Sequence, residues 1–222
     1  MGAPMDAESR KIPSHEVTYA RLRDMILFGH LAPGAPVTIQ GLIGDLGAGM
    51  TPVREAIRRL TAEGALLPQG NRRVSVPELK AEMLEQVAFA RLAIEPKLAA
   101  LAAPKLTGAQ IDRLEAIDGA VNRAIEAGNL PDYLSANHAF HFALYEAAEA
   151  PVLLDLARSL WLRAGPSLRA VIDRFGREVA PDLHREAIAA MRAGDAKALA
   201  SAIERDIQQG VDHVRQALAE GH

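Results

Sequence analysis

A helical pattern of apolar residues runs from Glu78 to the C-terminus and leaves little room for β-structure in that part of the chain. The spacing of three and four residues is clearest near the end, at Leu199, Ile203, Ile207, Val211, Val214 and Leu218. Glycine and proline interrupt the pattern at Gly108, Gly128-Asn129, Pro151, Gly165-Pro166, Gly176 and Gly194. The spacing therefore predicts an all-helical domain over residues 78–222, a bundle of about six or seven helices.

The preceding stretch, residues 14–77, is built from short elements. Apolar spacing, caps and glycine stops predict three helices, at about 14–29, 38–46 and 50–63. Two extended runs then flank a Gly70-Asn71 tip, which predicts a two-stranded hairpin whose Pro68 suits an edge strand. Three helices followed by a hairpin predict a winged helix-turn-helix. Residues 1–13 show no periodicity, and we expect them to be a flexible N-terminus.

Length and composition fit a mainly α-helical chain of two domains. A chain of 222 residues exceeds one ordinary domain. Residues 1–77 hold 9 Lys and Arg against 7 Asp and Glu, whereas residues 78–222 hold 16 against 21, so a mildly basic segment precedes an acidic one. The sequence has no cysteine, and no apolar run approaches the roughly 20 residues of a membrane span. We therefore expect a cytoplasmic protein with no membrane partner.

The third helix and the hairpin carry side chains that suit nucleic acid. A helix in this position presents its N-terminal half to base edges, while a wing reaches phosphates or the minor groove. The candidate DNA contacts are Gln40 on the second helix, Met50, Thr51, Arg54 and Arg58 on the third, and Gly70, Asn71, Arg72 and Arg73 at the wing. Charge alone equally allows a solvated helix face on which arginines pair with Glu55 or Glu63.

The stretch LGAGMTPVREAIRRLTAEGALL, from Leu46 to Leu67, resembles the recognition segment of the GntR family of bacterial transcription regulators. The likeness extends upstream through the LAPG turn and downstream through the wing. It implies a homodimer that binds double-stranded operator DNA as a repressor. Family members commonly carry Ser-Arg where this chain has Gly49-Met50. Because Met50 cannot donate a hydrogen bond, we expect Thr51 and Arg54 to carry the base readout and Glu55 to be structural.

Polar side chains interrupt the apolar face of the helical domain. One helical stripe carries Tyr133, Asn137, Phe140, His141 and Leu144. Asn137 and His141 are four residues apart, a spacing that lets both reach one ion. His184 and Asp206 also lie among apolar residues on later helices. Such polar groups in an apolar interior need partners, which a metal or a ligand can supply.

Residues 80–222 resemble the helical ligand-binding (FCD) domain of the FadR-type branch of that family. The motifs that carry the likeness are Arg91 to Glu95, Asn137 to His141, His184 to Ile188, and Gly194-Asp195. Many relatives place Asp at the position of Asn137 and His at those of His141, His184 and Asp206, and bind a divalent metal there. The resemblance implies a zinc, manganese or nickel site on these four residues. The alternative is a metal-free polar pocket in which Asp206 pairs with a histidine.

Three arginines of the helical domain are candidates for binding an effector. Arg91, Arg163 and Arg169 can each hold a carboxylate with a bidentate fork, and effectors of this branch are often organic or sugar acids. Arg91 can equally pair with Glu95, four residues further on. The resemblance thus implies a carboxylate-containing small molecule as the effector.

Together these features predict a sequence-specific, effector-controlled transcription regulator and not an enzyme. Two alternatives stay open at this point. One is a helical metal-dependent enzyme, although HExxH, paired carboxylates and a phosphate-binding loop are all missing from the sequence. The other is a small-molecule binding protein without DNA binding, for which Gly49-Met50 is the only hint.

Overall fold

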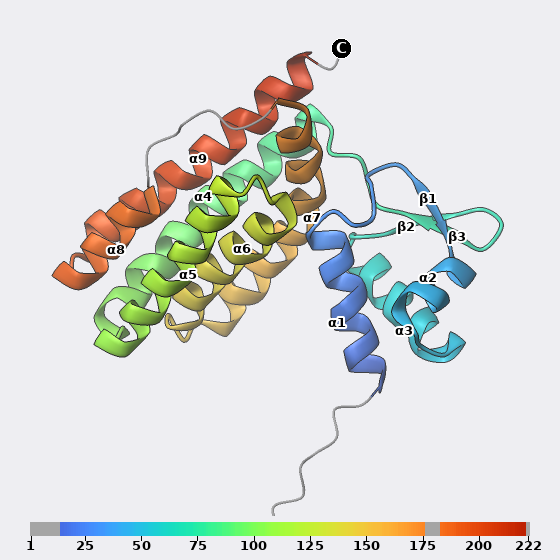
Figure 1. The fold of residues 1–222 in the computed structure, drawn as a ribbon, viewed down its shortest axis with the longest axis horizontal. Coiled ribbons are helices and arrows are strands. Elements are labelled where there is room, and N and C mark those ends of the chain that lie inside the picture. Colours follow the sequence, from blue (N-terminus) through green and yellow to red (C-terminus); the bar gives the residue numbers. More distant parts are fainter. Residues whose placement is uncertain (1–13, 176–182, 221–222) are drawn as a thin grey trace, which may run out of the picture.

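The computed structural model describes residues 14–175 and 183–220, with the backbone alone for residues 166–175. Its first part, here called the head, contains α1 (Ser14–Leu27), β1 (Pro36–Thr38), α2 (Ile39–Leu46), α3 (Met50–Ala62), β2 (Leu67–Gln69) and β3 (Arg73–Ser75). The second part, the bundle, contains α4 (Ala81–Ala102), the 3-10 turn η1 (Ala103–Lys105), α5 (Gly108–Glu126), α6 (Leu130–Glu146), α7 (Pro151–Phe175), α8 (Leu183–Ala193) and α9 (Ala196–Glu220). Figure 1 shows the head beside the bundle, with α1 and α7 between them.

The helices of the head begin and end where local chemistry dictates. The hydroxyl of Thr38 accepts a hydrogen bond from the Gly41 N–H at 3.0 Å and caps α2, and Gly47 ends that helix with a φ of 58°. Val53, Ala56 and Leu60 are buried along one side of α3. The opposite side of α3 therefore remains available to solvent or to a partner.

The wing has one strand more than the expected hairpin. Its sheet is antiparallel in the order β1-β3-β2, with Val37 opposite Val74 and Pro68 on the edge strand β2, as the sequence predicts. Asn71 and Arg72 both have positive φ angles, 60° and 57°, as a tight hairpin turn requires. Strand β1 is only three residues long and runs straight into α2, so its sequence pattern is too short to predict it.

Six α-helices, α4–α9, form the bundle within the described residues, in agreement with the expected number. The predicted stop at Gly165-Pro166 is wrong, because α7 continues through both residues to Phe175. An internal proline removes one helical hydrogen bond, but α7 packs against α1, α4, α6 and α9, and these contacts hold its turns together. No helix in the described part of the chain is long and apolar enough to cross a membrane.

The hydrophobic core extends through both parts of the molecule. In the bundle, α4 packs against α7 and α9 and lies near its centre. Fully buried side chains there include Leu98, Phe140, Tyr145, Leu199 and Ile203. The buried residues of the head belong to the same continuous cluster, because α1 packs against α7. This shared core fixes the head against the helix that also borders the polar site described below.

Candidate functional site

The exposed side of α3 presents one arginine without a partner. Arg54 is exposed and has no ion pair or hydrogen bond among the described residues, and Thr51 and Met50 are exposed beside it. Arg58 is also exposed, but its guanidinium binds the Glu55 carboxylate at 2.7 and 3.1 Å. An ion pair of this exposed kind is weak, so it can exchange for a phosphate or a base.

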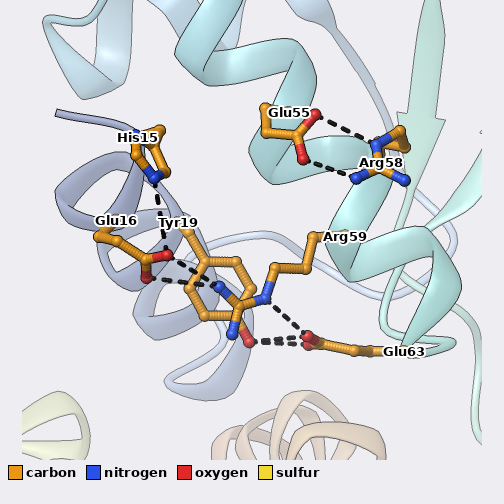
Figure 2. A network of polar contacts seen from close by, with 7 residues as sticks. All are labelled: His15, Glu16, Tyr19, Glu55, Arg58, Arg59 and Glu63. Atoms are coloured by element: carbon orange, nitrogen blue, oxygen red, sulfur yellow. Dashed lines mark hydrogen bonds and ion pairs between the residues drawn. The ribbon is translucent and has the colours of Figure 1, made fainter. Parts of the chain in front are cut away.

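Arg59 lies on a different side of α3 and belongs to an internal network, which Figure 2 shows. Its guanidinium stacks 3.7 Å from the centre of the Tyr19 ring and pairs with Glu16 and Glu63, each at 3.3 Å. The Tyr19 hydroxyl donates to the Glu63 carboxylate at 2.8 Å. Burial, together with that carboxylate, raises the pKa of Tyr19 to about 12. This network fixes α3 on α1 and takes Arg59 out of the DNA-facing set.

The remaining candidates of the head lie on the surface. Gln40 at the start of α2 is exposed, and so is the whole turn of the wing. The exposed residues of this turn and the strand after it are Gly70, Asn71, Arg72 and Arg73. Neither wing arginine forms an ion pair with any described residue. The head thus presents three cations without protein partners, one on α3 and two at the wing.

A group of metal-ligating side chains lies inside the bundle. His141 on α6, His184 on α8 and Asp206 on α9 each offer one ligand atom, and these three atoms lie within 4.8 Å of one another. The His141 Nε2 atom is 3.1 Å from Asp206 Oδ2, and the His184 Nε2 atom is 4.0 Å from Asp206 Oδ1. Both imidazoles are buried and Asp206 is partly exposed. Residues far apart in the sequence thus converge on one point.

The orientation of His141 is set by a chain of hydrogen bonds. Tyr145 donates its single proton to the Glu95 carboxylate at 2.8 Å, so its oxygen accepts from His141 Nδ1 at 3.1 Å. Nδ1 therefore carries a proton, and in the neutral ring the lone pair is on Nε2, which faces Asp206. A carboxylate facing a lone pair is stable only when a proton or a metal ion lies between them.

The carboxylate of Asp118 sets the orientation of His184. Its Nδ1 atom binds Asp118 Oδ1 at 2.9 Å, while its ring stacks on Phe140 with centroids 3.9 Å apart. Its Nε2 atom is buried and is the single described side-chain nitrogen or oxygen of that kind without a hydrogen-bond partner. A buried nitrogen without a partner is costly, and carboxylate-supported histidines are typical of metal sites.

Asp206 completes the set with a charged oxygen. Burial opposes its ionisation, but when a proton lies between Asp206 and His141 Nε2, this hydrogen bond and the nearby positive charges outweigh burial and hold the pKa of Asp206 below its usual value. Ligands of one zinc ion each lie about 2.0–2.2 Å from it, so two donor atoms that share the ion lie up to about 4 Å apart, and the two distances to Asp206, 3.1 and 4.0 Å, meet this condition. Two imidazole nitrogens and one carboxylate oxygen fit a divalent transition metal.

The comparisons with known proteins identify the family of the chain. Residues 15–76 match the model of the bacterial regulatory proteins of the gntR family, and residues 86–209 match the model of the FCD domain. The chain belongs to the GntR family. Within this family it has the domain composition of the FadR-like branch, which is an N-terminal helix-turn-helix followed by a C-terminal FCD domain.

Relatives of this GntR-family protein are transcription regulators and not enzymes. It is 28% identical to the HTH-type transcriptional regulator McbR of Escherichia coli K12, over 86% of this chain and 87% of that protein. It is 29% identical to a probable D-xylose utilization operon transcriptional repressor of Paenarthrobacter nicotinovorans, over 86% and 85%. The solved structure of E. coli McbR/YncC superposes with a TM-score of 0.85, at 25% identity over 93% of this chain and 99% of that one.

The structure brings together three of the four predicted metal ligands. Asn137 is buried on α6, one turn before His141, and its amide makes no hydrogen bond within the described residues. The sequence analysis missed Asp118 and the pair Glu95 and Tyr145, which support the two histidines. The sequence did indicate a role for Glu95. A glutamate four residues after Arg91 in an apolar helix is expected to be buried and to need a hydrogen-bond or ion-pair partner.

The three candidate effector arginines differ in their positions and partners. Arg91 forms the predicted pair with Glu95, with nitrogen–oxygen distances of 2.6 and 3.3 Å, and its guanidinium lies over the Trp161 ring. Burial opposes its charge, but Glu95 outweighs burial and raises the pKa of Arg91. Arg163 binds the backbone carbonyl of Glu63 in the head. The side chain of Arg169 lies outside the described residues.

Proposed function

We propose that this GntR-family protein is a cytoplasmic transcription repressor that binds operator DNA as a homodimer. Its DNA affinity is controlled by a carboxylate-containing small molecule that binds in the bundle, beside a divalent metal held by His141, His184 and Asp206. The domain boundary lies at residue 77 or 78. The alternatives to this proposal are a metal-free pocket and a binding protein without affinity for DNA.

The observation that carries the DNA-binding role is the unpaired Arg54 on the exposed side of α3. Arginine reads guanine through a bidentate contact in the major groove, and no described residue competes for the donors of Arg54. Thr51 and Met50 lie beside it at the start of the helix, where Thr51 can reach a base and Met50 can contact a thymine methyl. We expect Gln40 and the exposed wing residues Gly70 to Arg73 to contact the DNA backbone.

The observation that carries the metal site is the orphan nitrogen of His184, buried within 4.0 Å of Asp206. Asn137, one turn from His141, is the fourth candidate ligand or a group that orients the effector. Zinc, manganese or nickel bound here would supply a Lewis-acidic centre for a carboxylate. The chain itself supplies the fixed tautomers, through Asp118 and Glu95, that aim both imidazoles at the same point.

The test begins with selection of operator sequences from a random double-stranded DNA pool by the purified wild-type protein. A homodimer enriches a palindrome with half-sites about one turn of DNA apart. Arg54→Ala weakens binding to the enriched sequence by about 1 to 3 kcal/mol and relaxes selection at one position of each half-site. The matched control is Arg192→Ala, which removes an exposed arginine of the bundle.

Several outcomes would contradict the proposal. A pool without enrichment, with zinc present or absent, would favour a binding protein without DNA recognition. Enrichment of a single half-site by a protein that sediments as a monomer would contradict the homodimer. Loss of enrichment with Arg192→Ala as well as with Arg54→Ala would mean that the variants report on general charge and not on base readout.

A further inference from the structure

The bundle contacts the head at the C-terminal end of α3. The Arg163 guanidinium, on α7, donates to the backbone carbonyl of Glu63 at 3.1 Å. This carbonyl belongs to the last turn of α3, where carbonyls lack helical partners and the helix dipole favours a cation. Arg163 thus acts as a cap that comes from the other domain.

The contact is too tight to be incidental. Gly64, which follows Glu63, has a φ of 75°, and a Cβ atom at this position would lie 2.8 Å from an Nη atom of Arg163. Two residues further along α7, a Cβ atom at Gly165 would lie 2.7 Å from the Leu27 carbonyl of α1. Gly165 therefore lets α7 approach α1 more closely than any other residue would allow, whereas a side chain at Gly64 would displace the exposed Arg163 guanidinium.

The end of α3 is held from two sides. The Glu63 side chain accepts hydrogen bonds from Tyr19 of α1 and from Arg59 of α3 itself, so Tyr19 ties it to α1, as Figure 2 shows. Its backbone carbonyl accepts from Arg163 of α7. The orientation of α3 relative to the bundle thus depends on α1 and on α7 together.

The same helix also borders the buried site. Trp161, two residues before Arg163, donates its indole N–H to Glu95 at 3.0 Å, and its ring centre lies 5.1 Å from that of His141. Glu95 holds Tyr145, which holds His141. Trp161 of α7 therefore contacts the surroundings of the site, and Arg163, two residues later, contacts the end of α3.

We propose that Arg163 is a positioning residue that couples occupancy of the site to the orientation of α3. The inference rests on the proposed function. A change at His141 reaches Trp161 through the buried contacts around Glu95, and a shift of α7 moves the guanidinium that caps α3. Because linkage is reciprocal, DNA on the head must alter metal affinity by the same factor as metal alters DNA affinity.

The test measures the affinity of the enriched operator DNA for the full chain with zinc added and after EDTA treatment. For the wild type, the two dissociation constants are expected to differ by at least about fivefold. In Arg163→Met, which keeps an apolar stem but no donor, the ratio is expected to fall to within twofold. Zinc affinity of this variant without DNA stays at the wild-type value, and Arg163→Lys restores part of the ratio.

Two matched controls separate coupling from loss of structure. Arg158→Met removes an exposed arginine of α7 that pairs within the bundle, and it keeps the wild-type ratio. Gly64→Ala lowers the ratio because its methyl group displaces Arg163. Gly128→Ala imposes similar backbone strain, at a φ of 63°, with nothing within 4 Å of the new Cβ, and it leaves the ratio unchanged.

The inference is overturned if Arg163→Met keeps the wild-type ratio, or if the wild type binds both DNA and zinc but shows no difference between the two conditions. Those results would leave the proposed function standing. Failure of the wild type to bind DNA, or to bind zinc, would overturn the proposed function first and the coupling with it.

Discussion

The two functional surfaces of the molecule treat their charges in opposite ways. On the head, Arg54, Arg72 and Arg73 are exposed and have no partner within the described part of the chain. In the bundle, Glu95 is buried and pairs with the partly buried Arg91, and His141 and His184 are each held by a defined hydrogen bond. Water satisfies the donors of the head until DNA replaces it. The buried polar groups of the bundle are shielded from solvent, so they must be satisfied by each other or by a ligand.

This difference has a consequence for mutation. The exposed charges of the head named above can be removed with little effect on folding, because no buried group loses an ion-pair partner when they are removed. Charges in the bundle are coupled, so that removal of one leaves another buried and unpaired. The predictions below test this contrast, beginning with the largest effect.

Glu95→Gln should lower the free energy of unfolding by about 3 kcal/mol, because it leaves the largely buried Arg91 charge without its partner. Glu95 is 0% exposed, whereas Glu85 on the same helix is exposed and pairs with Arg215. Urea denaturation measures both variants, and Glu85→Gln should change stability far less. Equal losses for the two variants would refute the contrast between buried and exposed pairs.

Zinc should stabilise the wild type by about 2 to 3 kcal/mol when the ion is at roughly 100 times its dissociation constant. The physical reason is that the folded chain alone presents the three ligands together. Thermal unfolding with zinc and with EDTA measures the difference. His184→Gln should abolish it, and His213→Gln, at an exposed position two turns beyond Asp206 on α9, should retain it. Stabilisation that survives in His184→Gln would place the ion elsewhere.

Arg73→Ala should weaken binding to operator DNA by about tenfold at low salt, and to unrelated DNA by a similar factor. A phosphate contact carries no sequence information, so the slope of log affinity against log salt should fall by about one. Titrations at several salt concentrations measure this slope. Arg113→Ala, at an exposed position of α5, is the control. A change in sequence preference instead would mean that the wing reads bases.

The smallest expected effect is a pH dependence from His138, which stacks on Phe142 with centroids 4.3 Å apart. Burial, with nearby positive charge, lowers the pKa of His138 from 6.5 to about 3. Because the unfolded chain then binds the proton more readily, stability is complete above about pH 6.5 and falls with pH between 6.5 and 3. The loss at pH 5.5 should be about 1 kcal/mol.

Denaturant titrations at pH 7.5 and pH 5.5 measure the effect of His138. His138→Phe removes the titrating group and keeps an aromatic ring, so its stability should change less between these two pH values. A variant with the full wild-type pH dependence would show that other groups are responsible.

Much of the fold follows from local sequence. The three helices of the head, the edge position of Pro68 and the helical nature of everything after Glu78 depend on period, caps and turns, which act over a few residues. The strand β1 and the continuation of α7 through Pro166 were not predicted, because pairing with β3 and packing against four helices decide them.

The sequence by itself determined which residues are candidates for the chemistry. The motif TPVREA placed Arg54 at the start of α3, and the stripe on α6 together with two later helices indicated His141, His184 and Asp206. Only the tertiary structure decided how these residues are used. It separated Arg58 and Arg59 from Arg54 by giving them carboxylate partners, and it aimed both histidines through Glu95, Tyr145 and Asp118. The physical reason is that hydrogen bonds and burial depend on neighbours that are tens of residues apart in the chain.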